Sequence, residues 1–327
     1  MLTDHLPRIT VAHLPTPLEP LPRLTAEIGG PDLWVKRDDQ TGLATGGNKA
    51  RKLEFLVADA LHQEADTLIT CGAQQSNHAR QTAAAGAKFG LDAILVLRGE
   101  EPARMEGNLL LDRLLGARII WAGDAPPHEV ASEVARELEA GGRRPYVVPY
   151  GGSNPVGASG YVAAMGELTA QCEDRGITFD HIVLASSSGG TQAGLVVAAR
   201  ASQFQGRILG ISIDLRADDL QVKLAELATA TASHLGLELA LSPADFLVDD
   251  AYLGGGYGVV SDLERAAIET AARSEGLLLD PVYTGRAFGG LLDLMNRGSF
   301  QPGEKVVFWH TGGTAALFGK PELLRAA

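Results

Sequence analysis

The segment Thr41-Gly-Leu-Ala-Thr-Gly-Gly-Asn-Lys-Ala-Arg-Lys-Leu-Glu54 joins a glycine-rich turn to a helical pattern. The apolar residues of this pattern have the three- and four-residue spacing of an amphipathic helix, and they are Leu53, Leu56, Val57, Ala60 and Leu61. We therefore expect a helix that begins near Gly47 or Asn48 and carries Lys49 in its first turn. The positive end of the helix dipole, and any burial, would disfavour the charged form of this lysine.

A neutral Lys49 amine would be a nucleophile able to form a Schiff base with a carbonyl group. The alternative is an ordinary solvated lysine, and the rest of the chain has to decide between the two. A nucleotide-binding P-loop is a third interpretation, because Gly42 and Gly47 have the required spacing. It is set aside because Asn48 precedes the lysine and Ala50 stands where the motif needs Ser or Thr.

Short apolar runs alternate with helical patterns on both sides of a break at residues 151–155. The runs cover residues 33–37, 67–71, 93–97, 117–121, 145–149, 181–185, 208–213 and 305–309. Such alternation is typical of parallel sheets covered by helices on both faces. The break predicts two α/β blocks and hence two sheets, with ligands bound beyond the carboxyl ends of the strands.

Composition narrows the class of protein. The chain has 327 residues and 45% hydrophobic residues, enough for a sizeable core, and its formal net charge of −12 disfavours nucleic-acid and anionic-membrane partners. No apolar run reaches membrane-spanning length, and the N-terminal residues do not resemble a signal peptide. The two cysteines lack metal-binding spacing. We expect a cytoplasmic protein with a small-molecule substrate, no membrane partner and no bound metal.

A phosphate-binding loop is predicted after the apolar run at residues 181–185. Ser186-Ser-Ser-Gly-Gly-Thr191 leads into a helical pattern, and glycines, hydroxyls and a helix N-terminus together favour bound anions. Neither the dinucleotide fingerprint nor a Walker A sequence is present in this loop, which favours a monophosphate. An empty glycine-serine loop is the alternative.

Polar residues also follow the run at residues 67–71. Ser76 and Asn77 could serve a ligand, or Ser76 could simply cap a helix, while His78 fits a packed or surface histidine better than a metal ligand. Tyr257 lies in a glycine-rich loop and Tyr283 in a turn that enters a helix. A phenol can act as acid or base, although one buried hydrogen bond is the simpler role for each tyrosine alone.

A first-turn lysine and a separate phosphate loop together suit a cofactor that has a carbonyl and one phosphate. Pyridoxal 5'-phosphate is such a cofactor, and it acts as an electron sink for carbanions at the Cα atom of amino acids.

Seven motifs, in order along nearly the whole chain, give it a close resemblance to a known family. They are Gly46-Gly-Asn-Lys-Ala-Arg-Lys-Leu-Glu54, Gln75-Ser-Asn-His-Ala-Arg-Gln-Thr82, Gly151-Gly-Ser-Asn154, Gly189-Gly-Thr-Gln-Ala-Gly194, Gly256-Tyr-Gly258, Leu279-Asp-Pro-Val-Tyr283 and His310-Thr-Gly-Gly313. The chain resembles the D-cysteine desulfhydrase and 1-aminocyclopropane-1-carboxylate (ACC) deaminase family of fold-type II pyridoxal-phosphate enzymes. This implies two three-layer α/β domains with mostly parallel sheets, similar to the tryptophan synthase β subunit.

The resemblance implies roles for individual residues. Lys49 would hold the cofactor as a Schiff base, and Asn77 would contact the hydroxyl of its ring. Ser76 would meet the substrate carboxylate or help to move protons, and Tyr257 and Tyr283 would flank the substrate. The remaining cofactor-binding residues would be Ser188, Gly189, Gly190 and Thr191 at the phosphate, with Lys52 assisting, and Thr284 near the pyridine nitrogen.

Domain limits and assembly also follow from the resemblance. A smaller inserted domain would cover residues 48–154, and residues 1–47 plus 155–327 would form the larger, cofactor-binding domain. The family is usually homodimeric, so we expect a homodimer.

Thr284 bears on the substrate, because the deaminase branch has a glutamate at this position. Glutamate keeps the pyridine nitrogen protonated and the electron sink strong, whereas threonine offers a neutral hydrogen bond. Expelling a thiolate or sulfite from Cβ needs a weaker sink than opening a cyclopropane, so Thr284 favours a desulfhydrase-like β-elimination, with D-cysteine to pyruvate, hydrogen sulfide and ammonia as the best guess. ACC deaminase, L-cysteate sulfo-lyase and a cofactor-binding protein without turnover remain the alternatives.

Overall fold

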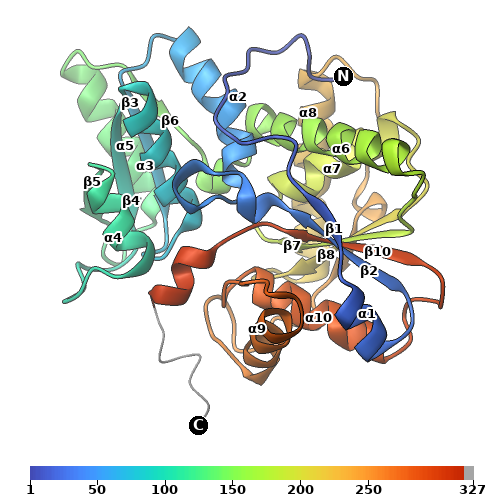
Figure 1. Ribbon diagram of the computed structural model, residues 1–327. Coiled ribbons are helices and arrows are strands. Elements are labelled where there is room, and N and C mark those ends of the chain that lie inside the picture. The colour runs from blue at the N-terminus through green and yellow to red at the C-terminus, as the bar shows by residue number, and fades with distance from the viewer. Residues whose placement is uncertain (320–327) are drawn as a thin grey trace.

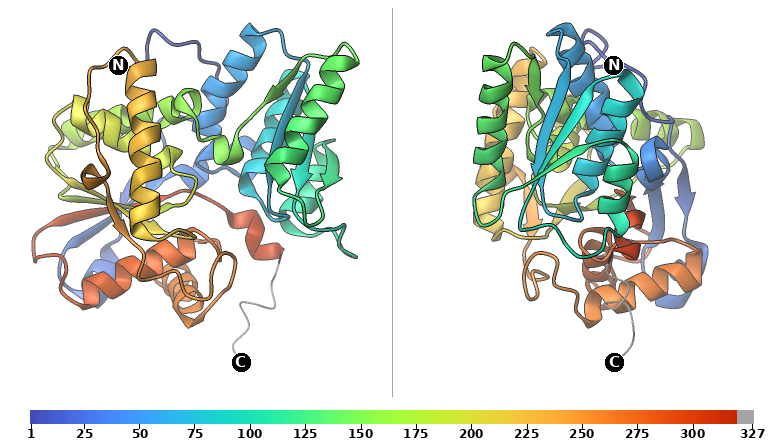
Figure 2. Two further views of the ribbon diagram at one scale, coloured as in Figure 1. Left: turned by 180° about the vertical axis from the view of Figure 1, so that it is seen from behind. Right: turned by 90° about the vertical axis from the view of Figure 1, so that its left-hand side faces the viewer.

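The computed structural model describes residues 1–319, which form two sheets that lie side by side (Figures 1 and 2). The larger sheet has the spatial order β1 (Leu18–Pro20), β2 (Asp32–Arg37), β10 (Lys305–His310), β7 (His181–Ser186), β8 (Arg207–Ser212) and β9 (Leu247–Asp249). Its strands pair in parallel except β1, which is antiparallel to β2. Most residues of β7 and β10 are buried, as expected of strands covered on both faces.

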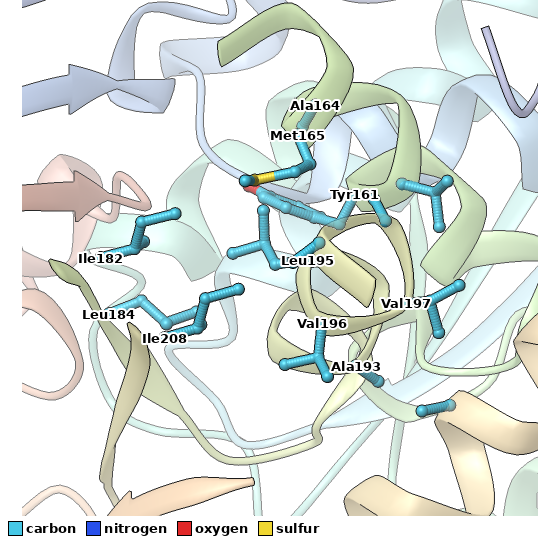
Figure 3. Packing of buried hydrophobic residues seen from close by; sticks show 14 of the residues in the cluster. Tyr161, Ala164, Met165, Ile182, Leu184, Ala193, Leu195, Val196, Val197 and Ile208 are labelled. Carbon is cyan, nitrogen blue, oxygen red and sulfur yellow. The ribbon is translucent and has the colours of Figure 1, made fainter. Parts of the chain in front are cut away.

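Two groups of helices cover the larger sheet (Figure 1). On one face lie α6 (Pro155–Arg175), α7 (Gly190–Ala201) and α8 (Ala217–His234), and on the other lie α1 (Pro22–Ile28), α9 (Asp262–Glu275) and α10 (Thr284–Asn296). Figure 3 shows the first interface, where Tyr161 and Met165 of α6 and Leu195 of α7 pack near Ile182 and Ile208 of the strands. This interface fixes the position of α7, which follows the predicted phosphate loop.

The smaller sheet is entirely parallel, with the order β5 (Arg118–Trp121), β4 (Asp92–Leu97), β3 (Thr67–Gly72) and β6 (Pro145–Val147). Alternate strand residues face opposite sides of the sheet. One side packs on α2 (Lys49–His62), α3 (Asn77–Phe89) and α4 (Gly107–Leu114), and the other packs on α5 (Pro127–Ala140).

The fold class predicted from the sequence is confirmed. Helix α2 begins at Lys49 with Asn48 as its N-cap, within one residue of the expected position. The sequence pattern did not predict the short edge strands β1 and β9, nor the 3-10 helices Asp38–Gln40, Leu43–Thr45, Tyr150–Gly152, Pro243–Asp245 and Thr314–Phe318. The limits of an inserted domain at residues 48–154 stay a prediction, since α2 also packs against α6.

Within residues 1–319, no helix combines the length and the apolar character needed to cross a membrane.

A buried carboxylate ties α2 to the larger sheet. Asp38, at the end of β2, accepts hydrogen bonds from Arg51 Nε and Nη2 at 2.9 and 2.8 Å, from Tyr161 and from the Trp309 indole at 2.8 Å. The Thr16 hydroxyl donates a fifth bond at 3.0 Å. Burial alone would raise the pKa of Asp38, but its partners, Arg51 above all, hold that pKa below the ordinary value.

The same network continues to a second carboxylate. Arg51 Nη1 and Nη2 donate to Glu167 of α6 at 3.0 and 2.9 Å, and the buried Lys36 ammonium pairs with Glu167 at 2.5 Å. Charges at this depth need partners, because an unpaired buried charge is strongly destabilising. The network therefore fixes α2, and with it Lys49, against β2 and α6.

We expect Asp38→Asn to lower the free energy of unfolding by about 3–5 kcal/mol, because the buried Arg51 would lose its closest counter-charge. Urea denaturation measures the loss. The control is Glu133→Gln, which removes an exposed ion pair to Arg136 and should change stability by no more than about 0.5 kcal/mol. Equal effects of the two substitutions would contradict the importance given to the buried network.

Candidate active site

A cavity lies where the two blocks meet, at the carboxyl ends of β3, β7 and β10. Its wall includes the first turn of α2 and the loops that follow these three strands, and it contains seven of the predicted site residues: Lys49, Ser76, Asn77, Ser188, Gly189, Thr191 and Tyr283. Of the other predicted residues, Lys52 and Gly190 lie beside the predicted phosphate loop, and the Tyr257 hydroxyl contacts the Tyr283 hydroxyl. Thr284 is outside the lining.

Lys49 is held at the start of α2 by a short chain of hydrogen bonds. Its Nζ donates to Asn48 Oδ1 at 3.1 Å, and Asn48 Nδ2 donates to Thr191 Oγ1 at 3.0 Å. Burial lowers the pKa of Lys49 to about 8, while the Asp280 carboxylate opposes this change and Arg80 adds to it. A substantial neutral fraction near neutral pH is the property that a Schiff-base lysine needs.

The predicted phosphate loop forms a cradle around the N-terminus of α7. Gly189 has a φ of +94°, which favours glycine, and the Gly190 N–H donates to Ser153 Oγ at 3.1 Å. Ser153 Oγ also lies 2.8 Å from Ser188 Oγ and accepts from Lys52 Nζ at 3.1 Å. Hydroxyls, an ammonium group and a helix N-terminus thus meet at one point, which suits a phosphate monoester.

Lys52 points to an anionic ligand. It is buried, and its hydrogen-bond partners are neutral oxygens, the Gly151 carbonyl at 3.0 Å and Ser153 Oγ. Among residues 1–319 no carboxylate forms an ion pair with it, and burial lowers its pKa well below the ordinary value, aided by the charges of Lys49 and Lys223. A bound phosphate would supply the missing counter-charge, so the residues present fit the phosphate of pyridoxal phosphate.

Ser76 and Asn77 lie at the start of α3. Ser76 is the N-cap residue, and its Oγ accepts from the Ala79 N–H at 3.1 Å while the side chain also lines the cavity. Asn77 Oδ1 accepts from Asn108 Nδ2 at 2.9 Å, so the amide is oriented by α4. The capping role of Ser76 is thus present, and it leaves the residue in a position to meet a ligand.

The two tyrosines are in direct contact. Their hydroxyls lie 2.7 Å apart, and their rings pack edge to face with centroids 5.9 Å apart. Burial raises the pKa of Tyr283 well above the ordinary value and raises that of Tyr257 as well. Both phenols are therefore neutral near pH 7 and available as proton donors, with Tyr283 in the cavity and Tyr257 38% exposed behind it.

The structure changes the environment expected for Thr284. Its side chain is buried, its hydroxyl donates to Asp280 Oδ1 at 2.7 Å and it accepts the Asp280 N–H at 2.7 Å. Asp280, rather than Thr284, lines the cavity. A contact between Thr284 and the cofactor stays a prediction, and its hydroxyl proton is already committed to a carboxylate.

Three further residues of the site were not predicted from the sequence. Ser153 links Lys52 to the phosphate cradle, Asp280 places a carboxylate in the cavity, and Tyr150 adds a second phenol to its wall beside Tyr283. All three stand in or beside motifs that were recognised, at residues 151–154 and 279–283. Only the folded geometry shows which side chains of these motifs turn inward.

Comparison with known proteins agrees with this geometry. The family model described as "Pyridoxal-phosphate dependent enzyme" matches residues 9–312. A D-cysteine desulfhydrase of Klebsiella pneumoniae subsp. pneumoniae is 44% identical over 319 residues, which are 95% of each chain. A Pyrococcus furiosus protein, provisionally named an ACC deaminase, is 43% identical over 323 residues, covering 97% of this chain and 95% of the relative.

Solved structures extend the comparison. A crystal structure of an ACC deaminase homologue superposes with a TM-score of 0.91 at 42% identity, covering 99% of this chain and 97% of the other. A threonine deaminase of Solanum lycopersicum shares the fold, with a TM-score of 0.64 at 18% identity over 91% of this chain and 79% of the other. Fold and cavity together define a fold-type II pyridoxal-phosphate enzyme. Within that class the chain belongs to the D-cysteine desulfhydrase and ACC deaminase family, whose cofactor is pyridoxal phosphate.

Covalent capture of pyridoxal phosphate by the apoprotein is expected to accelerate with pH around a midpoint near 8. At pH 7 about one tenth of Lys49 would be neutral, against about one in 3,000 for a lysine with a pKa of 10.5. Stopped-flow absorbance followed by borohydride trapping measures the rate, with Lys49→Ala as the baseline. A midpoint near 10.5 would show that Lys49 is an ordinary lysine.

Gly190→Ala should weaken pyridoxal-phosphate affinity at least tenfold, about 1.4 kcal/mol. A Cβ atom at this position would lie 2.7 Å from Ser153 Oγ and 2.8 Å from Lys52 Nζ, within the cradle. Fluorescence titration of the apoprotein gives the affinity. Gly166→Ala in α6 is the matched control, because its new methyl group would meet only the Met1 side chain, at 3.6 Å. Unchanged affinity in Gly190→Ala would place the phosphate elsewhere.

Proposed function

We propose that the protein catalyses α,β-elimination on a small sulfur-containing amino acid, with D-cysteine as the best candidate. D-Cysteine and one water would give pyruvate, hydrogen sulfide and ammonia, a balanced reaction without an external oxidant or reductant. The observation that carries the proposal is the placement of Lys49, with its lowered pKa, in one cavity with Ser76 and Tyr283. The 44% identity to an enzyme named D-cysteine desulfhydrase supports the choice of substrate.

Pyridoxal phosphate, when bound, withdraws electrons from the substrate Cα atom. Side chains of the protein would carry out the proton transfers and hold the substrate. Lys49 Nζ would accept the Cα proton, because its pKa of about 8 makes a base available near neutral pH. Ser76, whose backbone is fixed at the N-terminus of α3, would receive the substrate carboxylate.

Protonation of the departing sulfur would fall to the tyrosine pair. Both phenols keep their protons near neutral pH, and the hydrogen bond between their hydroxyls allows Tyr257 to restore a proton lost from Tyr283. Tyr257 is 38% exposed and can recover its own proton from solvent.

Thr284 supports elimination over cyclopropane opening, since it lacks the carboxylate that the deaminase branch has at this position. Its hydroxyl proton is directed to Asp280 Oδ1, so toward the cofactor it would act as an acceptor. L-Cysteate sulfo-lyase and ACC deaminase remain alternative activities, and the provisional name of the Pyrococcus furiosus relative favours the second. A cofactor-binding protein without turnover is the alternative from a different class. A homodimer, implied by the resemblance, and a cytoplasmic location, expected from the composition, are also part of the proposal.

The holoenzyme is expected to release equal amounts of pyruvate and sulfide from D-cysteine, at a higher kcat/KM than for L-cysteine, L-cysteate or ACC. Coupled lactate dehydrogenase assays measure pyruvate, and ACC turnover is followed as 2-oxobutyrate. Lys49→Ala supplied with cofactor is the control and should lose at least 10³-fold in rate, the scale of a lost covalent and base catalyst. Turnover of ACC alone would overturn the interpretation of Thr284, and no turnover of any substrate would favour a binding protein.

A further inference from the structure

A second cavity, of about 590 Å³, adjoins the active site. The segments that follow β3 and β4 form one wall, and the loop that carries Tyr257 forms part of the other. It therefore lies between the two blocks, on the same side as the catalytic cavity. The proposed reaction does not use this space.

Tyr257 separates the two cavities. Its side chain lines the second cavity, and its hydroxyl lies 2.7 Å from the hydroxyl of Tyr283, which lines the first. At 38% exposure Tyr257 faces solvent on that side. The tyrosine pair, Tyr257 and then Tyr283, therefore lies between the second cavity and Lys49.

The charged groups around the second cavity are mostly positive. Arg98 and Arg104 line it together with a single carboxylate, Glu106. Both side chains are exposed, and neither forms an ion pair with a carboxylate among residues 1–319. Both guanidinium groups are thus free to interact with an anion from solution.

This local charge opposes the charge of the whole chain. A formal net charge of −12 repels anions at long range, whereas every elimination turnover takes up a zwitterionic amino acid through its carboxylate and ammonium groups and releases a 2-keto acid anion. A cleft whose charged groups are mostly of one sign concentrates counter-ions and raises their association rates. Two unpaired arginines at the approach to Lys49 would offset the general repulsion.

We propose that this cavity is an anion-binding antechamber that takes small carboxylates, the amino acid on its way in and the 2-keto acid on its way out. Arg98 and Arg104 attract the carboxylate, and Tyr257 forms the inner wall. The assignment of the amino acid as the entering ligand and of the 2-keto acid as the leaving ligand rests on the proposed elimination, whereas the binding of carboxylates does not.

The kinetic test uses the holoenzyme with D-cysteine at sodium chloride concentrations from about 20 to 500 mM. R98A/R104A should lower kcat/KM about 3- to 10-fold at low salt, leave kcat unchanged and lose most of the salt dependence seen in the parent enzyme. E106Q should shift kcat/KM in the opposite direction. R118A is the matched control, an exposed arginine of β5 outside the cavity, and should change nothing.

A binding test separates the antechamber from the proposed activity. Line broadening of ¹³C-labelled pyruvate by the holoenzyme should weaken several-fold in R98A/R104A and stay unchanged in R118A, whether or not D-cysteine is turned over. The bound-cofactor absorbance of each variant checks that it is folded. Arginine-dependent pyruvate binding without D-cysteine turnover would support the antechamber and reject the activity. Equal pyruvate binding and equal salt dependence in all variants would overturn the antechamber.

Discussion

The burial of Asp38 and Arg51 is the constraint on which the position of the active site depends. Asp38 directly follows β2 of the larger sheet, while Arg51 lies in the first turn of α2, two residues after Lys49. Because both are almost completely buried, each needs the other, and Glu167 of α6 completes the pairing. The helix that carries the reactive lysine is thus held to the larger sheet by charge, although it packs on the smaller sheet through its apolar face.

The two lysines of α2 show how neighbouring groups set the pKa and the role of a buried amine. Lys49 and Lys52 are one turn apart, and burial lowers the pKa of both. Lys49 faces the Asp280 carboxylate across the cavity, which keeps its pKa near 8 and leaves both protonation states accessible. Lys52 faces neutral oxygens in the cradle and lacks a carboxylate partner in the described structure, so a phosphate there gains a full counter-charge.

Much of the fold and the site could be predicted from the sequence, because hydrophobic periodicity and glycine-rich junctions are local signals. Each main strand and helix produced a periodic run, and the junctions after the strands identified Lys49, Ser76 and Thr191. The edge strands β1 and β9 were missed because their apolar runs are interrupted: β1 has one apolar residue before Glu19 and Pro20, and β9 has two before Asp249. Asp280 and Tyr150 were missed because their inward orientation depends on tertiary packing.

Thr284 shows why a single substitution does not decide an activity by itself. From the sequence it is a neutral residue at a position that holds glutamate in the deaminase branch. In the fold its hydroxyl is polarised by Asp280, a carboxylate that itself accepts four hydrogen bonds, from Thr284 Oγ1 and from the backbone N–H groups of residues 282, 283 and 284. A contact between Thr284 and the pyridine nitrogen, which the resemblance implies, would make this pair set the electron sink. A threonine backed by a carboxylate would then be a stronger acceptor than an isolated threonine, though weaker than a glutamate in direct contact. An intermediate sink suits substrates with good leaving groups, which is the chemistry of β-elimination.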